Sequence, residues 1–163
     1  MSFFLVASQI LVFFHIAFGE FAAASLLWAT KELIYLKKDR LIWLRRTLWA
    51  AFLSVMMAWA VGGTYYLLFY PQVKPVIKEG PEAWGHSIVM ESKEHIFLFL
   101  PVLLFLLALF VQRHGELLLD NPLLKRRFLY ATLGSTVLIF SMAIMGYLIT
   151  WSARSALWLN SGL

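Results

Sequence analysis

The sequence contains no cysteine among its 163 residues. This absence excludes structural disulfides, thiolate zinc sites, iron–sulfur clusters and a haem attached covalently through a Cys-x-x-Cys-His motif. It does not exclude haem b, which needs only axial side chains from the protein. Charged residues are also scarce, because they make up 14% of the chain, whereas soluble domains contain about 25%.

Apolar residues are correspondingly abundant. They make up 61% of the chain, and the mean hydropathy is +0.77. Aromatic residues are abundant, with 14 Phe, 7 Trp and 6 Tyr, which suits lipid-facing surfaces, interfacial belts and the walls of a flat cofactor pocket. We therefore expect the chain to have lipid as its solvent. The net charge of +5 does not predict nucleic-acid binding, since the basic residues lie in short loops between apolar segments.

Four apolar segments predict four membrane-spanning helices, at about residues 3–30, 47–70, 84–112 and 128–152. Each is long enough to cross roughly 30 Å of hydrocarbon at about 1.5 Å per residue. The purely apolar part of the third segment has only 16 residues, so its helix is expected to begin earlier and to carry charged residues into the bilayer. The N-terminus lacks the basic region of a signal peptide, which predicts that the first segment is retained. The expected fold is all-α, a single transmembrane domain over residues 1–163 built as an up-down four-helix bundle.

The distribution of Lys and Arg predicts the orientation of the bundle. The connection over residues 31–46 carries six of them and the connection over residues 113–127 carries four. The positive-inside rule places both connections in the cytoplasm. Both termini and the outer connection, residues 71–85, then face the periplasmic side of a cell inner membrane. That outer connection is rich in proline and glycine, so we expect an ordered turn or a short interfacial piece there.

A small set of ionisable residues interrupts the apolar segments. His15 lies about eleven or twelve residues inside the first segment, and His95 lies eleven residues after Trp84 in the third. Both histidines are therefore expected roughly 16 Å along helices that run in the same direction, at matching depth. Ionisable residues inside a membrane usually face the bundle interior and serve a function. This depth match predicts that His15 and His95 are the axial ligands of one haem b, and a second haem would need His86, His114 or a ligand from another chain.

Three carboxylates accompany this pair. Glu91 shares a helix face with His95, four residues away, and Glu94 flanks that face. We expect Glu91 and Glu94 to tune the haem or to accept protons from a quinol. Glu20 lies five residues after His15 and is predicted to relay its proton or to pair with another subunit.

Further residues are predicted to line the cofactor site. Small residues beside the histidines, among them Gly19 and Gly63, would make room for the macrocycle. Lys93 points nearly opposite His95 on the helix, so it is expected to snorkel outward or to meet an anionic group such as a haem propionate. His86, in the outer connection, is expected at the interface, where it would assist a quinol or a haem.

One pattern resembles the N-terminal helices of cytochrome bd oxidase subunit I over about 110 residues. The histidine of the family's first helix matches His15, and the Gly- and Tyr-rich exit from its second helix matches Gly62-Gly63-Thr64-Tyr65-Tyr66. The outer connection matches Gly80-Pro81-Glu82-Ala83-Trp84, and two glutamates of the third helix match Glu91 and Glu94. The resemblance implies a haem b held in a membrane bundle with Tyr66 near it. This chain has only four predicted spans, has His95 where the family has an apolar residue, and lacks the later ligands and the quinol loop, so oxygen reduction is not implied.

Three functions follow as hypotheses. The first is a membrane b-type cytochrome that carries electrons, is linked to quinol and forms a subunit of a larger redox complex. If it is an enzyme, it would be a quinol-linked oxidoreductase subunit. Its partners would be the lipid bilayer, other membrane or periplasmic redox subunits, or further copies of itself. The second is a proton or divalent-metal conductor that uses His15, Glu91, Glu94 and His95 as metal ligands or relay groups. The third is a non-catalytic assembly subunit whose polar cluster holds helices together.

Overall fold

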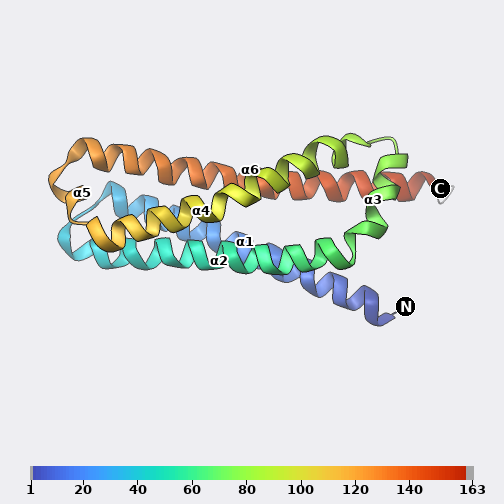
Figure 1. Ribbon diagram of the computed structural model, residues 1–163, viewed down its shortest axis with the longest axis horizontal. Coiled ribbons are helices and arrows are strands. Elements are labelled where there is room, and N and C mark those ends of the chain that lie inside the picture. The colour runs from blue at the N-terminus through green and yellow to red at the C-terminus, as the bar shows by residue number, and fades with distance from the viewer. Residues whose placement is uncertain (1, 161–163) are drawn as a thin grey trace.

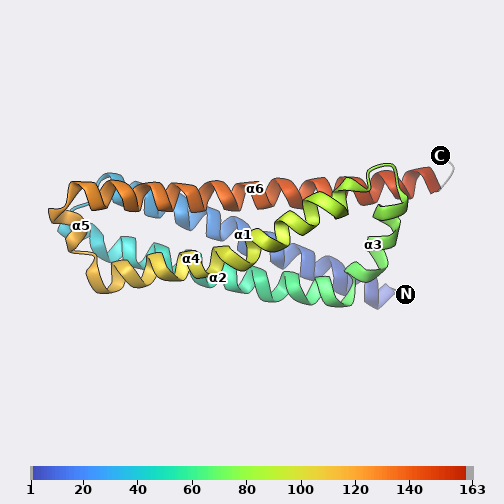
Figure 2. The same ribbon diagram turned by 45° about the horizontal axis from the view of Figure 1, so that its top comes forward.

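The computed structural model describes the backbone of residues 2–160 and the side chains of residues 6–159. Four long helices run side by side (Figure 1), namely α1 (Ser2–Ile34), α2 (Leu41–Leu68), α4 (Glu91–His114) and α6 (Pro122–Asn160). Short helical pieces connect them, namely η1 (Lys38–Arg40), α3 (Tyr70–Glu79), η2 (Gly85–Met90) and α5 (Leu117–Asp120). Successive long helices run in opposite directions, which confirms the predicted all-α up-down bundle. The bundle has a η1–α5 end and, opposite to it, an α3–η2 end (Figures 1 and 2).

At the η1–α5 end, each long helix extends beyond the apolar segment that predicts it. α1 continues through Lys31 and Glu32 to Ile34, and α2 begins at Leu41 rather than near residue 47. Basic side chains can stay helical at a membrane surface because their aliphatic stems reach toward water. At this end of the bundle, hydropathy alone therefore places the helix ends too far inside the membrane.

The third span begins as a π-helix. η2 runs directly into α4, so Glu91 and Glu94 lie within a continuous helix, as the short apolar stretch predicts. α3 fills the outer connection, where the proline-rich sequence predicts an ordered piece. Pro101 lies inside α4 and cannot donate a hydrogen bond to the carbonyl of Phe97. α4 runs obliquely across the bundle, as Figures 1 and 2 show.

The hydrophobic core is built on helical spacing. On α1 the buried residues recur every three or four positions, at Ala22, Leu26, Ala29 and Leu33, and α2 repeats this spacing at Leu44, Leu48, Ala51 and Val55. α1 packs mainly on α2 and α6, and α4 packs on the same two helices, so α1 and α4 lie diagonally. Lipid offers no hydrophobic drive for helix association, so close packing by small residues such as these alanines is what holds α1 to α2.

Candidate functional site

His15, on α1, contacts α2 and α4 in the half of the bundle nearest the α3–η2 end. Its Nδ1 atom is 2.9 Å from the carbonyl oxygen of Ala58 on α2. A carbonyl oxygen only accepts hydrogen bonds, so Nδ1 carries the proton and donates it. Nε2 is then left with its lone pair, and it has no hydrogen bond to the described part of the chain. The Phe97 ring of α4 meets the imidazole edge-on, with the ring centroids 6.1 Å apart.

Gly62 makes room for the His15 ring. A Cβ atom at Gly62 would lie 2.5 Å from Nδ1 and 2.7 Å from Cε1 of His15, distances that van der Waals contact does not permit. Gly63, one position on, has open space around it, since no atom lies within 4 Å of its hypothetical Cβ. The sequence predicts that both glycines make room for a group beside the histidines, and of the two it is Gly62 that lies against the His15 ring.

Lys93 faces the bundle interior. Its Nζ atom lies 3.2 Å from the position that a Cβ of Gly146 on α6 would occupy, and its charge acts on His15. The sequence predicts that Lys93 snorkels outward or meets an anionic group, and the structure places its amine between α4 and α6. It makes no ion pair within the described residues. An amine in this position is available to a negatively charged group inside the bundle.

Glu94 begins a line of polar side chains that ends near α3. One carboxylate oxygen, Oε1, is buried and has no hydrogen-bond partner among the described residues, while the carboxylate interacts with the Tyr66 hydroxyl. The Tyr66 ring stacks on Tyr70 at a centroid distance of 5.2 Å, and the Tyr70 hydroxyl is hydrogen-bonded to Nδ1 of His86 at 2.9 Å. Burial, with Tyr66 and Glu94 nearby, raises the pKa of Tyr70, so its hydroxyl keeps its proton at neutral pH.

His86, which the sequence predicts to lie at the interface, is buried within the protein, with 4% of its surface exposed. The π-helix η2 turns it inward against Tyr70. Its neighbour Gly85 packs against α6 so closely that a Cβ there would overlap the Ser152 hydroxyl. No hydropathy signal distinguishes this histidine, because the inward turn depends on the packing of η2 on α6.

His95 and Glu91 lie together on the exposed side of α4. The Nδ1 atom of His95 is 2.6 Å from the Glu91 carbonyl oxygen, and both residues line a shallow depression of about 480 Å³ with Ser87, Ile88, Ser92 and Ile96. The two residues share a face, as their spacing predicts. That face points away from His15, so the structure does not bring the two predicted axial histidines together.

The other predicted residues show no contact with the His15 side chain. Glu20 is exposed on α1, and Gly19 has open space around it. His114 is exposed at the η1–α5 end, where its ring lies against Phe110 at 5.8 Å. Within residues 6–159, no group of three or more His, Asp or Glu side chains is close enough to hold a metal ion.

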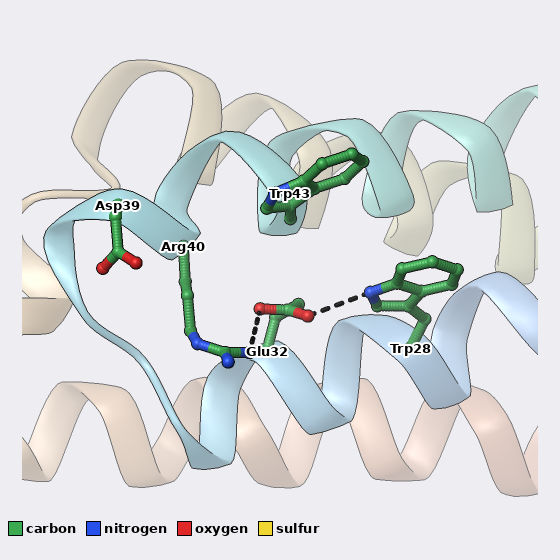
Figure 3. A pocket seen from close by; sticks show the side chains of 5 residues that line it. All are labelled: Trp28, Glu32, Asp39, Arg40 and Trp43. Carbon is green, nitrogen blue, oxygen red and sulfur yellow. Dashed lines mark hydrogen bonds and ion pairs between the residues drawn. The ribbon is translucent and has the colours of Figure 1, made fainter.

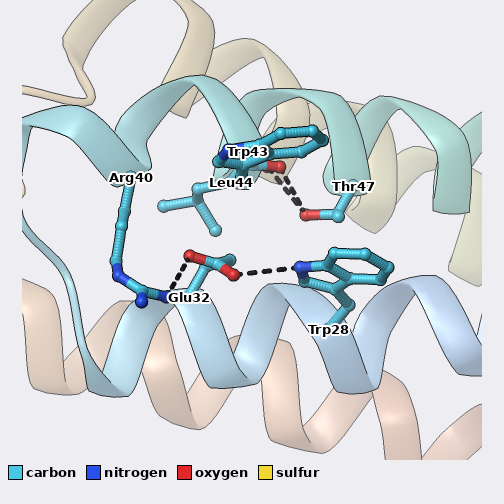
Figure 4. Close-up of polar contacts among 6 residues, drawn as sticks. All are labelled: Trp28, Glu32, Arg40, Trp43, Leu44 and Thr47. Atoms are coloured by element: carbon cyan, nitrogen blue, oxygen red, sulfur yellow. Dashed lines mark hydrogen bonds and ion pairs between the residues drawn. The ribbon is translucent and has the colours of Figure 1, made fainter.

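A second polar cluster, at the η1–α5 end, has no counterpart among the sequence predictions. Glu32 on α1 is buried, with 3% of its surface exposed. Its carboxylate accepts a hydrogen bond from Trp28 Nε1 at 2.9 Å and pairs with Arg40 Nη1 at 3.0 Å (Figures 3 and 4). Sequence reasoning placed residue 32 in a solvated basic loop. The contact between Trp28 and Glu32 could have been predicted from their i, i+4 spacing, which puts both side chains on one helix face.

Comparison of the chain with protein-family models, with curated proteins and with solved structures finds no match. The class of protein therefore follows from the fold itself. Four helices are long and apolar enough to cross a membrane, and most of their large hydrophobic side chains remain exposed on the outside of the bundle. The chain is a multi-pass helical membrane protein with polar side chains enclosed in both halves of the bundle.

Proposed function

We propose that the protein binds a haem b through His15 and carries electrons within the membrane, as a quinol-linked subunit of a larger redox complex. The observation that supports this most directly is the state of the His15 ring. Donation from Nδ1 to Ala58 fixes the tautomer that leaves the Nε2 lone pair open, which is the arrangement of a metal-ligating histidine whose other nitrogen is held by a backbone carbonyl. A bound haem b would supply one-electron exchange between ferric and ferrous iron.

The neighbours of His15 fit such a group in part. Within the described residues the Lys93 amine makes no ion pair and the buried Glu94 Oε1 has no hydrogen-bond partner, and orphaned polar groups of this kind often mark a ligand site. Lys93 would pair with a propionate. His95 does not fit the proposed role of second ligand in this arrangement, because it lies on the exposed side of α4. The proposal therefore rests on His15 as the ligand, with the opposite axial position left open by the protein.

An absorbance spectrum of the full chain, expressed with ample haem and purified in mild detergent, tests this proposal. We expect a Soret band, a pyridine haemochrome of the b type and a high-spin spectrum that changes with carbon monoxide. His15→Ala should abolish the bound haem, whereas His114→Ala, at the opposite end of the bundle, should retain it. A haem-free preparation, or full haem content in His15→Ala, would contradict the proposal. A low-spin spectrum that becomes high-spin in His95→Ala would instead support the sequence prediction that His15 and His95 are both axial ligands.

A second candidate, proton transfer, is favoured by the line from Glu94 through Tyr66 and Tyr70 to His86. These four side chains connect the bundle interior to the region of α3, and a buried carboxylate beside a phenol is a plausible proton carrier. A haem-free protein that moves protons across liposome membranes would favour this function. Glu94→Gln should then slow the flux by about a hundredfold or more, the contribution of a positioned proton donor, and the exposed Glu91→Gln should not.

A further inference from the structure

The depression on the exposed side of α4 has the chemistry of a ligand site that opens to the membrane. It measures about 480 Å³ and is lined by Ser87, Ile88, Glu91, Ser92, His95 and Ile96. Ligand pockets in proteins measure about 300–1,000 Å³. The lining combines hydroxyl, carboxylate and imidazole groups with apolar walls, so it suits a molecule that has a polar head and an apolar body.

The depth of the depression indicates where such a ligand comes from. The span Gly85–His114 has 30 residues, which is about 45 Å of helix at about 1.5 Å per residue. Crossing the hydrocarbon takes about 30 Å, so roughly 7 Å at each end lies among the headgroups. Glu91 lies six residues after Gly85, close to that boundary, and His95 lies one turn deeper. A ligand that reaches both side chains therefore arrives through the bilayer.

Both ionisable side chains of the lining accept hydrogen bonds. Nδ1 of His95 is 2.6 Å from the Glu91 carbonyl oxygen, and a carbonyl oxygen only accepts, so Nδ1 carries the proton of the neutral ring. Nε2 then presents its lone pair, and the Glu91 carboxylate presents two acceptor oxygens. Neither side chain forms an ion pair within the described part of the chain. The site therefore suits a ligand that donates two hydrogen bonds.

A metal ion and a phospholipid headgroup fit this pair of acceptors less well. Within residues 6–159, no third His, Asp or Glu joins the pair to complete a metal site, and zinc takes three or four protein ligands. The phosphate of a phospholipid carries the same sign of charge as the Glu91 carboxylate, and it lies among the headgroups, whereas His95 lies deeper. A neutral ligand with two hydroxyl groups avoids both difficulties.

The same face of α4 continues as an apolar strip toward the middle of the membrane. Phe99 and Val102 follow His95 by four and seven residues, so they share its helix face. Their side chains are 56% and 55% exposed. A polar depression at the edge of the hydrocarbon, followed by this strip, matches a polar ring that carries an apolar tail.

We propose that the depression binds the hydroquinone ring of a quinol. The two hydroxyl groups donate to Nε2 of His95 and to the Glu91 carboxylate, one helical turn apart, a separation that hydroxyls on opposite sides of one ring span. Ile88 and Ile96 contact the ring, and the tail lies along Phe99. This inference rests on the quinol link of the proposed function and assigns that link a site, on the side of α4 that faces away from the proposed haem.

Native mass spectrometry of the full chain, released from phosphatidylcholine nanodiscs, tests the site with decylubiquinol as the probe. Dithionite keeps the quinol and any haem reduced, so binding is measured without electron transfer. The control ligand is the dimethyl ether of the same quinol, which has the same tail and no O–H group. We expect the quinol to bind about tenfold or more tightly than the ether, which is the effect of one hydrogen bond to a charged group.

Substitutions in the lining test which side chains give this preference. His95→Leu and Glu91→Gln should each reduce the preference for the quinol, and the double variant should abolish it. Both side chains are exposed, so neither change should disturb the fold. The matched control is the double variant His114→Leu and Glu116→Gln, which removes the same two chemical groups from exposed positions at the η1–α5 end. It should leave the preference unchanged.

The outcomes separate this site from a protein interface and from the haem. Equal binding of the quinol and its ether, or a preference that survives the His95 and Glu91 double variant, overturns the proposal. A wild-type dimer that becomes a monomer in this double variant shows that the face is an interface between two copies instead. His15→Ala should keep the preference for the quinol, so a chain that lacks a Soret band but prefers the quinol contradicts the proposed haem and supports the site.

Discussion

His15 and Gly62 are closely fitted across the contact between α1 and α2. The imidazole occupies the space that a side chain on Gly62 would need, and the hydrogen bond to Ala58, one turn earlier on α2, fixes its orientation. The chemistry of His15 therefore depends on the absence of a single methyl group on the neighbouring helix.

We predict that Gly62→Ala destabilises the protein by about 1–3 kcal/mol, the usual cost of overpacking, and displaces the His15 ring. Gly63→Ala is the control. It should be neutral or raise stability by up to about 1 kcal/mol, since alanine is the better helix former and nothing crowds its Cβ. Thermal unfolding in detergent and the haem content of both variants provide the measurement. Equal stability and equal haem content in the two would show that Gly62 does not accommodate His15.

At the scale of elements, η2 differs most from regular structure. A π-helix adds a residue to the turn and rotates what precedes it relative to α4, which here turns His86 inward and leaves His95 on the exposed side. Close contact between Gly85 and Ser152 of α6 holds η2 in place. The orientation of the whole charged run, residues 91–95, therefore depends on how η2 packs.

We predict that Gly85→Ala destabilises the contact between η2 and α6, again by about 1–3 kcal/mol. Ser152→Gly in the same chain should recover part of this loss, because it removes both atoms that the new Cβ would meet. Gly134→Ala on α6, where nothing crowds the Cβ, should cost nothing. The unfolding midpoint in detergent is the measurement, and a Gly85→Ala variant as stable as Gly134→Ala would contradict this account of η2.

At the scale of the whole molecule, the two ends of the bundle carry different charge. Arg and Lys gather at the η1–α5 end, and the positive-inside rule predicts that this end is cytoplasmic. Because the chain contains no cysteine, a single introduced cysteine is the only site in it that a thiol reagent can label. A membrane-impermeant thiol reagent on intact cells should label Lys78→Cys, on α3, and should label Asp120→Cys only after the cells are opened. The reverse pattern would place both termini in the cytoplasm.

The sequence by itself determined the membrane class, the four spans and their up-down order, because hydropathy over about 20 residues is a strong signal that lipid imposes regardless of tertiary contacts. It also identified His15 and the 91–95 run as the unusual residues. Tertiary structure decided which of these face one another. Helical phase relates residues on one helix, as with Glu91 and His95, but the rotation of one helix relative to another depends on packing. Three packing features are visible only in the folded chain: the space at Gly62 that His15 fills, the π-helix that begins at Gly85, and the close approach of α4 to α6. In this packing Lys93, Glu94 and His86 face inward and His95 faces outward.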